Sequence, residues 1–301
     1  MKKVLVIVGP TAVGKTDFSL VLAKRFNGEI ISGDSIQAYR GFDIGSGKIM
    51  DTKGVVHYGL DILDANEEYS VCDFQAYARK HIDIISANDK LPMIVGGTGL
   101  YVKACLYDYE FGAQMERNDY SNYTNEQLYD LLKKVDEKSA ELIHPNNRRR
   151  VERALDIAYS GEAKSEREQR QEHKMLYDTF IIGCTMDREL LYERINKRVA
   201  IMAKEGLKDE LTKLIEQGVS FDMQPMKGIG YRQWEAYFNN EASEDEVVMK
   251  IQQASRNFAK RQYTWFNHQM PVNWVDMSDE HDVERIISEV ESWLYGTVSK
   301  N

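Results

Sequence analysis

The sequence has 301 residues, of which 43% are hydrophobic and 29% charged, as is ordinary for a folded globular protein. The net charge of −9 argues against a general nucleic-acid coat, which needs clustered cations, but it leaves room for a local basic surface. No apolar run approaches the roughly 20 residues of a membrane-spanning helix, so we expect no membrane partner. The N-terminal apolar run is too short for a signal-peptide core, and three widely spaced cysteines form no disulfide framework; both favour the cytoplasm.

The first third of the chain has the pattern of an α/β fold. Lys3 to Val8 is a β-branched apolar run that predicts a buried parallel strand, and apolar spacing predicts a helix over Lys15 to Phe26. Further strands are predicted at Glu29 to Ser32 and Leu91 to Val95, with a helix over Asp73 to Ala87 between them. Strands that alternate with helices predict a parallel sheet with helices on both faces.

The middle of the chain has little strand character from about Phe111 to Met175. Helices are predicted at Asn125 to Val135 and Arg149 to Tyr159, and the charged segment Glu162 to Lys174 is predicted to be a solvated helix or linker. The α/β pattern then returns, with strands at Thr179–Cys184 and Val272–Val275 and helical segments over Asp187–Gln217, Glu244–Phe266 and Val283–Trp293. We therefore predict an α/β core of residues 1–112 and 176–301, interrupted by a helical insertion of residues 113–175.

A phosphate-binding motif follows the first predicted strand. The segment Gly9-Pro10-Thr11-Ala12-Val13-Gly14-Lys15-Thr16 fits G-x-x-x-x-G-K-[ST], between a strand and a helix as the motif requires. The glycines let backbone N–H groups turn inward around an anion, the helix N-terminus adds partial positive charge, and Lys15 adds a full charge. Because the Thr16 hydroxyl can ligate Mg²⁺, the core is predicted to hold a diphosphate or triphosphate with Mg²⁺. Kinases, NTPases and other diphosphate users share this motif.

Two more segments follow the ends of predicted strands, where an open parallel sheet binds its ligands. Asp34 follows the second strand and is expected to face the same crevice as Lys15, where it could hold Mg²⁺ through water, act as a general base or cap a turn. Gln37 offers a donor and an acceptor that suit the edge of a purine. Thr98, in Gly96-Gly97-Thr98-Gly99, can donate a hydrogen bond to a phosphate and would form a second wall of the anion site.

Six segments together make the sequence specific. In chain order they are GPTAVGKT, DSIQAY, GGTGLY, HPNNRRRVERAL, KGIGYRQW and SRNFAKRQYTWF, and from Gly9 to about Phe266 the chain resembles the bacterial tRNA dimethylallyltransferases. This resemblance implies transfer of a dimethylallyl group from dimethylallyl diphosphate to the exocyclic N6 of the adenosine 3′-adjacent to a tRNA anticodon. Diphosphate would be released. The segment Gly45-Ser46-Gly47-Lys48 departs from the G-T-A-K-P of the family, and no cysteine/histidine finger follows the core.

The resemblance also implies roles for individual residues. The loop Gly9 to Thr16 would bind the donor's diphosphate with Mg²⁺ on Thr16, Lys15 and Thr98 would assist catalysis, and Asp34 would be the general base. Arg198 is a further candidate for the diphosphate. The residues implied to contact tRNA are Asp34, Ser35, Ile36 and Gln37, then Arg149, Arg150, Val151, Glu152 and Arg153, and finally Lys227, Gly228, Ile229, Gly230, Tyr231 and Arg232.

Several expectations and alternatives complete the prediction. The partners would be dimethylallyl diphosphate and the anticodon stem-loop of tRNA, and we expect a monomer with Mg²⁺ and no zinc. An adenylate isopentenyltransferase acting on AMP or ADP is the closest alternative, followed by a P-loop kinase and by a catalytically silent RNA-binding module. Core packing is favoured over base stacking for the aromatic residues Tyr231, Trp234, Tyr263, Trp265 and Phe266.

Overall fold

The computed structural model describes residues 1–111, 118–161, 165 and 174–296. The chain forms two compact units, a core of Met1–Leu106 and Leu176–Asn301 and an insertion of Tyr107–Met175. The insertion thus starts a few residues before the predicted boundary, because Tyr107 already pairs with Met175 in an isolated β-bridge. None of the helices described is long and apolar enough to cross a membrane.

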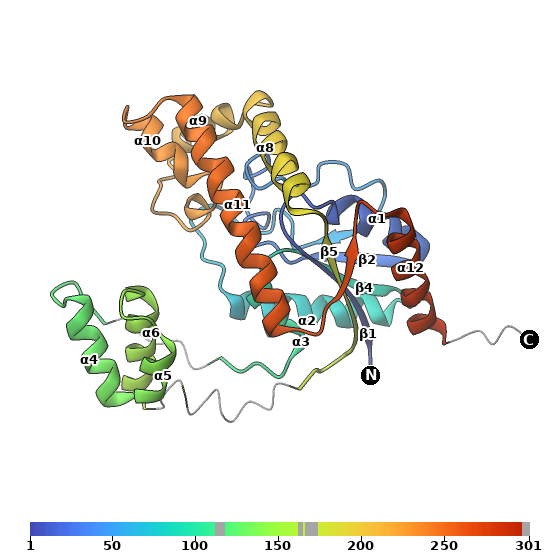
Figure 1. Ribbon diagram of the computed structural model, residues 1–301, viewed down its shortest axis with the longest axis horizontal. Coiled ribbons are helices and arrows are strands. Elements are labelled where there is room, and N and C mark those ends of the chain that lie inside the picture. Colours follow the sequence, from blue (N-terminus) through green and yellow to red (C-terminus); the bar gives the residue numbers. More distant parts are fainter. Residues whose placement is uncertain (112–117, 162–164, 166–173, 297–301) are drawn as a thin grey trace, which may run out of the picture. The chain divides into compact units, whose positions relative to one another are not determined.

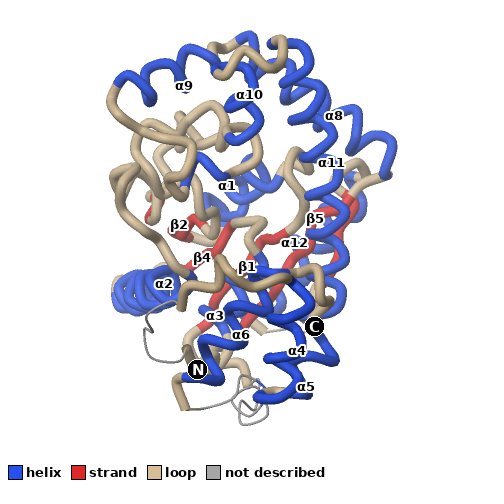
Figure 2. The backbone as a smooth tube through the Cα atoms, turned by 90° about the vertical axis from the view of Figure 1, so that its left-hand side faces the viewer, coloured by secondary structure: helices blue, strands red, loops and turns tan. Residues whose placement is uncertain are grey.

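A six-stranded, wholly parallel sheet forms the centre of the core. Its strand order is β3-β2-β4-β1-β5-β6, and Figure 2 shows β2, β4, β1 and β5 side by side in that order. The strands are β1 (Lys3–Val8), β2 (Gly28–Ser32), β3 (His57–Tyr58), β4 (Leu91–Val95), β5 (Asp178–Thr185) and β6 (Asn273–Asp276). The predicted α/β fold with a parallel sheet is confirmed.

Helices cover both faces of this sheet (Figure 1). On one face, α1 (Lys15–Arg25), α8 (Arg188–Lys204) and α12 (Glu280–Tyr295) bury apolar side chains in one cluster with Leu5 and Ile7 of β1. On the other face, α2 (Val71–Ala87) packs on β4 and against α3 (Gly99–Leu106). Alternate side chains of β1 point to opposite faces of the sheet. Because helices cover both faces, every apolar residue of this strand is buried, as its continuous apolar run predicts.

The helices between residues 207 and 269 contribute to the walls of the site described below. They are α9 (Leu207–Glu216), η1 (Pro225–Lys227), η2 (Arg232–Trp234), α10 (Glu235–Phe238) and the long α11 (Glu244–Gln269). Ser243 starts α11 with a capping box, in which its hydroxyl accepts from Glu246 N–H and the Glu246 carboxylate accepts from Ser243 N–H. This cap fixes where α11 begins, and hence which of its residues face the sheet.

The insertion is a small helical unit with its own core. Its helices are α4 (Asn125–Val135), α5 (Glu137–Leu142) and α6 (Arg148–Tyr159), and their buried residues include Leu128, Leu132 and Leu155. The sequence predicts α4 at its observed bounds and α6 within one residue, but it misses α5, which is too short for a periodic signal. Most of the segment 162–174, predicted as a solvated helix or linker, lies outside the described residues.

Candidate active site

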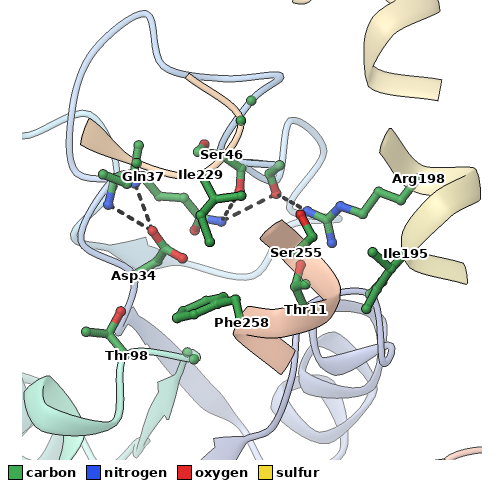
Figure 3. A pocket seen from close by; sticks show the side chains of 18 of the residues that line it. Thr11, Asp34, Gln37, Ser46, Thr98, Ile195, Arg198, Ile229, Ser255 and Phe258 are labelled. Atoms are coloured by element: carbon green, nitrogen blue, oxygen red, sulfur yellow. Dashed lines mark hydrogen bonds between the residues drawn. The ribbon is translucent and has the colours of Figure 1, made fainter. Parts of the chain in front are cut away.

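One pocket of about 330 Å³ lies at the carboxyl ends of β1, β2 and β4. The phosphate loop follows β1, Asp34 follows β2 and Thr98 follows β4, so the three segments predicted to share a crevice do line one pocket. Figure 3 shows Asp34, Thr98 and Thr11 around the cavity, with Phe258 and Ser255 of α11 between them. Arg198 of α8 also lines this pocket.

The phosphate loop holds its shape through backbone conformations that favour glycine. Gly9 has φ 141° and Gly14 has φ 106°, and an added Cβ at Gly9 would lie 2.5 Å from the carbonyl oxygen of Cys184 on β5. The Arg194 Nε of α8 donates to the carbonyl of Ala12 at 3.1 Å and braces the tip of the loop. This strand–turn–helix unit is therefore a preformed anion cradle, with Lys15 and Thr16 at the start of α1.

Lys15 projects its ammonium group within this cradle. Its Nζ donates to the carbonyl of Pro10 at 2.6 Å. Burial lowers the pKa of Lys15 to about 8, although the nearby Cys184 and Asp34 partly oppose this shift and Arg198 adds to it. A bound diphosphate would supply the negative charge that the site lacks, and would stabilise the protonated amine.

Asp34 has one carboxylate oxygen engaged in the fold and one directed into the pocket. Its Oδ1 accepts from the N–H groups of Ile36 at 2.8 Å and Gln37 at 3.3 Å, which is an Asx turn that starts the next segment. Among the described residues, no hydrogen bond reaches Oδ2, and Figure 3 shows the carboxylate facing the cavity. The turn-capping and general-base roles weighed for Asp34 are therefore compatible, because they use different oxygens.

The turn after β4 forms the second wall of the anion site. Thr98 immediately precedes α3, where its carbonyl accepts from Tyr101 N–H, and it lines the pocket. Gln262 of α11 joins this wall to the phosphate loop: its Oε1 accepts from Thr11 N–H at 3.2 Å and its Nε2 donates to the Gly97 carbonyl at 3.0 Å. The side chain of Gln262 is buried, so this brace is part of the site's framework.

An apolar wall beside the phosphate loop was missed by the sequence analysis. It comes from α8 and α11 and consists of Ile195, Val199, Met202, Ile251 and Phe258. The spacing of apolar residues along both helices predicts apolar faces. It does not distinguish side chains that pack in the core from those that line a cavity. The pocket thus combines an anion cradle with a hydrocarbon surface, which suits a ligand with a phosphate head and an apolar tail.

The segment after Asp34 forms the polar side of the pocket. Gln37 Nε2 donates weakly to the carbonyls of Ser46 and Gly47 at 3.4 Å, and Arg198 lies 3.5 Å from the Gly47 carbonyl. Lys48 is almost fully buried, and its Nζ donates to the Tyr39 carbonyl and pairs with Asp43 and Asp61. The Lys48 side chain therefore anchors the 45–48 segment, in which the sequence departs from the resembled family.

The candidate tRNA-contacting segment 227–232 divides into exposed and buried residues. Lys227 and Arg232 are exposed, and Gly228, Ile229 and Gly230 line the pocket. Tyr231 is fully buried and its hydroxyl is hydrogen-bonded within the protein, so its side chain is not available to stack on a base. Trp234 and Phe266 are also fully buried, as core packing predicts.

The candidate segment 149–153 in the insertion divides in the same way. Arg149, Arg150 and Arg153 are exposed on α6, whereas Val151 is fully buried in the core of the insertion, so its side chain cannot contact a ligand. The preceding Arg148 donates to the carbonyls of Tyr120 and Tyr123, which gives it a structural role. The three exposed arginines therefore place a basic surface on α6.

The side chains of the pocket fit a magnesium ion that is held mainly by the phosphate oxygens of a bound ligand. Among the described residues, no cluster of three or more histidine, cysteine, aspartate or glutamate side chains could hold a metal. Thr16 is exposed at the start of α1 and lines the pocket beside Lys15. Mg²⁺ commonly takes few protein oxygens together with phosphate oxygens and water, so a single hydroxyl at this position fits such an ion.

Comparisons with known proteins agree over nearly the whole chain. A family model described as "IPP transferase" matches residues 37–269, and one described as "Isopentenyl transferase" matches residues 2–55. The tRNA dimethylallyltransferase of Anoxybacillus flavithermus is 46% identical over 98% of this chain and 97% of its own length. That of Bacillus cereus is 45% identical over 97% of this chain and 96% of its own.

Solved structures are similar over the same span. The tRNA isopentenylpyrophosphate transferase of Bacillus halodurans is 40% identical with a TM-score of 0.75, covering 98% of this chain and 97% of that protein. The corresponding enzyme of Staphylococcus epidermidis is also 40% identical, with a TM-score of 0.73 and coverage of 98% and 99%. A eukaryotic dimethylallyltransferase acting on tRNA is 26% identical, with a TM-score of 0.84, over 98% of this chain and 80% of its own.

Proposed function

This chain belongs to the IPP transferase family, and from that premise we propose that it transfers a dimethylallyl group from dimethylallyl diphosphate to tRNA. The acceptor atom would be the exocyclic N6 of the adenosine 3′-adjacent to the anticodon, and diphosphate would be the second product. One observation carries the proposal: Lys15, the Asp34 carboxylate and an apolar wall converge on a single pocket. A kinase site would need no hydrocarbon surface at this position.

The phosphate loop and the apolar wall would together bind the donor, dimethylallyl diphosphate. The backbone N–H groups of the loop and the Lys15 ammonium would hold the diphosphate, with Thr98 on the opposite side. The five-carbon chain would lie against the side chains that α8 and α11 present, among them Ile195 and Phe258. Burial of that chain would favour an isoprenoid over the polar ribose of a nucleotide.

Asp34 would act as the general base for the adenine acceptor. The adenine amine would attack the allylic carbon, so that a C–N bond forms as the C–O bond to diphosphate breaks, and Asp34 Oδ2 would take the proton from the amine. Lys15 would stabilise the charge that develops on the departing diphosphate. A base must leave its stack to reach such a recessed pocket, as in other enzymes that modify a nucleobase.

Magnesium and the RNA complete the proposal. Thr16 would hold Mg²⁺ on the diphosphate, and the ion would neutralise charge on the leaving group. The exposed Arg149, Arg150 and Arg153 would contact the RNA backbone, and Lys227 and Arg232 would do so beside the pocket. We further propose that the protein acts as a cytoplasmic monomer.

The test is one incubation of the purified chain with undermodified tRNA, dimethylallyl diphosphate and Mg²⁺, followed by nucleoside mass spectrometry. An adenosine that gains the isoprenyl mass supports the proposal. Parallel arms replace the tRNA by AMP or ADP, or the donor by ATP. Prenylated AMP or ADP with unchanged tRNA would establish the adenylate activity instead, and phosphate transfer from ATP would establish a kinase.

A further inference from the structure

The four successive backbone N–H groups of residues 43–46, near the pocket, donate to two side chains that lie far along the sequence, Glu210 and Tyr231. The Glu210 Oε2 atom of α9 accepts from Asp43 N–H at 3.1 Å and Ile44 N–H at 2.6 Å, and Oε1 accepts from Gly45 N–H at 3.3 Å. The fourth group, Ser46 N–H, donates to the Tyr231 hydroxyl at 3.0 Å. That hydroxyl in turn donates to Glu210 Oε1 at 2.8 Å.

Such an arrangement fixes the turn 43–46 firmly. Parallel N–H groups in a turn form an anion-binding concavity, and here an internal carboxylate occupies it. Hydrogen bonds to a carboxylate are stronger than those between neutral groups. Burial, together with the adjacent Glu210 carboxylate, raises the pKa of Tyr231 well above its usual value, so its hydroxyl keeps the proton that it donates.

The turn continues directly into the polar side of the pocket. Gly45, Ser46 and Gly47 line the cavity, and the carbonyls of Ser46 and Gly47 hold the side-chain amide of Gln37. Tyr231 follows the lining segment 228–230, and an added Cβ at Gly230 would lie 3.0 Å from the Gly45 carbonyl oxygen. The two lining segments are therefore in close contact, and Glu210 is hydrogen-bonded to Gly45 of the first and to Tyr231, the residue that follows the second.

We propose that Glu210 is a positioning residue for the acceptor side of this pocket. It holds the turn 43–46 and Tyr231 in one unit, and thereby sets where Gln37 and Ile229 meet the incoming base. This inference rests on the proposed transfer to an adenine base. Among the described residues, the hydrogen bonds of Glu210 go to the turn 43–46 and to Tyr231 and none reaches the phosphate loop, so its effect should fall on the acceptor and not on the diphosphate.

The experiment compares Glu210→Gln and Tyr231→Phe with Glu216→Gln, which removes an exposed carboxylate from the same helix. For Glu210→Gln we expect kcat/KM for tRNA to fall by roughly ten- to a hundredfold, since misplaced groups cost about that much. The Kd for inorganic diphosphate should stay within about twofold, because the cradle is separate. Hydrogen–deuterium exchange should accelerate at residues 43–47 in both variants, and the double variant should be little worse than Glu210→Gln alone.

Two results would overturn the proposal. One is a folded Glu210→Gln protein with wild-type kcat/KM for tRNA and unchanged exchange at residues 43–47. The other is a fall in diphosphate affinity as large as the fall in kcat/KM, which would mark a general loss of structure. Tyr231→Phe supplies the same readouts if Glu210→Gln does not fold. Should the wild-type chain fail to modify tRNA, the proposed function fails, and the exchange and diphosphate measurements still decide whether Glu210 fixes the turn.

Discussion

The two sides of the pocket are built in different ways. The phosphate side is one continuous strand–turn–helix segment, in which Gly9, Gly14 and Lys15 provide the conformation and the charge. The acceptor side is assembled from the segments 43–47 and 228–231, which Glu210 of α9 holds together, and the adjacent Lys48 anchors the first segment through Asp43 and the Tyr39 carbonyl. Anion binding therefore depends on local sequence, whereas recognition of the acceptor depends on long-range packing.

This difference has a thermodynamic consequence. A local turn needs few distant contacts to form, so most substitutions far along the chain should leave the anion cradle intact; the braces from Arg194 and Gln262 are the exceptions. The acceptor side should lose its shape when Glu210 or Tyr231 is removed, because part-buried N–H groups are then left without an acceptor. Asp34 lies between the two sides, with Oδ1 in the fold and Oδ2 in the pocket.

The largest effect is expected for Asp34→Asn. This variant tests whether the chemical step can be slowed while both sides of the pocket keep their shape. Asparagine keeps an oxygen that can accept from Ile36 and Gln37 N–H, so the turn should survive. Loss of the general base should lower kcat by about 10²- to 10⁴-fold. Single-turnover prenylation measures the rate, and filter binding should show tRNA affinity close to wild type. An unchanged rate would remove Asp34 from the reaction.

The next largest effect is expected for diphosphate binding, which should depend on pH through the charge of Lys15 on the phosphate side. Because burial lowers the pKa of Lys15 to about 8 in the ligand-free protein, the amine is charged below pH 8 and loses its proton as pH rises through 8. If only the ammonium binds well, the Kd for inorganic diphosphate should be about tenfold higher at pH 9 than at pH 7. Isothermal titration calorimetry measures this.

The same titration contains its own control. At pH 8.5, binding should take up protons from the buffer, so the apparent enthalpy should differ between buffers of different ionisation enthalpy. Lys15→Ala should remove the part of this difference that Lys15 contributes, leaving only the part from the ionisation of diphosphate itself, and should also weaken binding. A Kd that is flat from pH 7 to pH 9 would contradict a Lys15 ammonium that binds the diphosphate.

A smaller effect is expected where the phosphate side itself needs a distant residue. Gln262→Leu removes both hydrogen bonds between α11 and the turns at Thr11 and Gly97 while nearly keeping the side-chain volume. We expect diphosphate affinity to fall by about three- to tenfold, as for the loss of one or two hydrogen bonds. Gln253→Leu, at an exposed position of the same helix, is the matched control. Affinity equal to that of the control would show the cradle to be wholly local.

The same contrast explains what could be predicted from the sequence. The phosphate loop, the strand β1 and the placement of Asp34 and Thr98 at one pocket all follow from local patterns and from the geometry of parallel sheets. Glu210 and Gln262 carry no local signal, because each is one polar residue within an ordinary amphipathic helix. Their partners are set only when α9 and α11 pack on the core.

Burial also separates residues that a motif groups together. Tyr231 and Val151 stand beside exposed cations in the sequence, but their side chains are directed into the core. For Val151 the signal was available, since the apolar period of α6 places it on the same face as Leu155. For Tyr231 no periodic pattern exists, because the segment around it consists of short turns.

The smallest effect on the reaction itself is expected for cations that belong to neither side of the pocket. Arg149 and Arg153 are exposed and one helical turn apart on α6, so Arg149→Ala plus Arg153→Ala should leave the insertion folded. If both contact phosphates, tRNA affinity at low salt should fall by about three- to tenfold, and the slope of log K against log salt should shrink by about 1 to 2. Diphosphate affinity and the rate at saturating tRNA should not change. A salt slope equal to wild type would place the RNA elsewhere, and a slower rate at saturation would mean that the insertion also shapes the pocket.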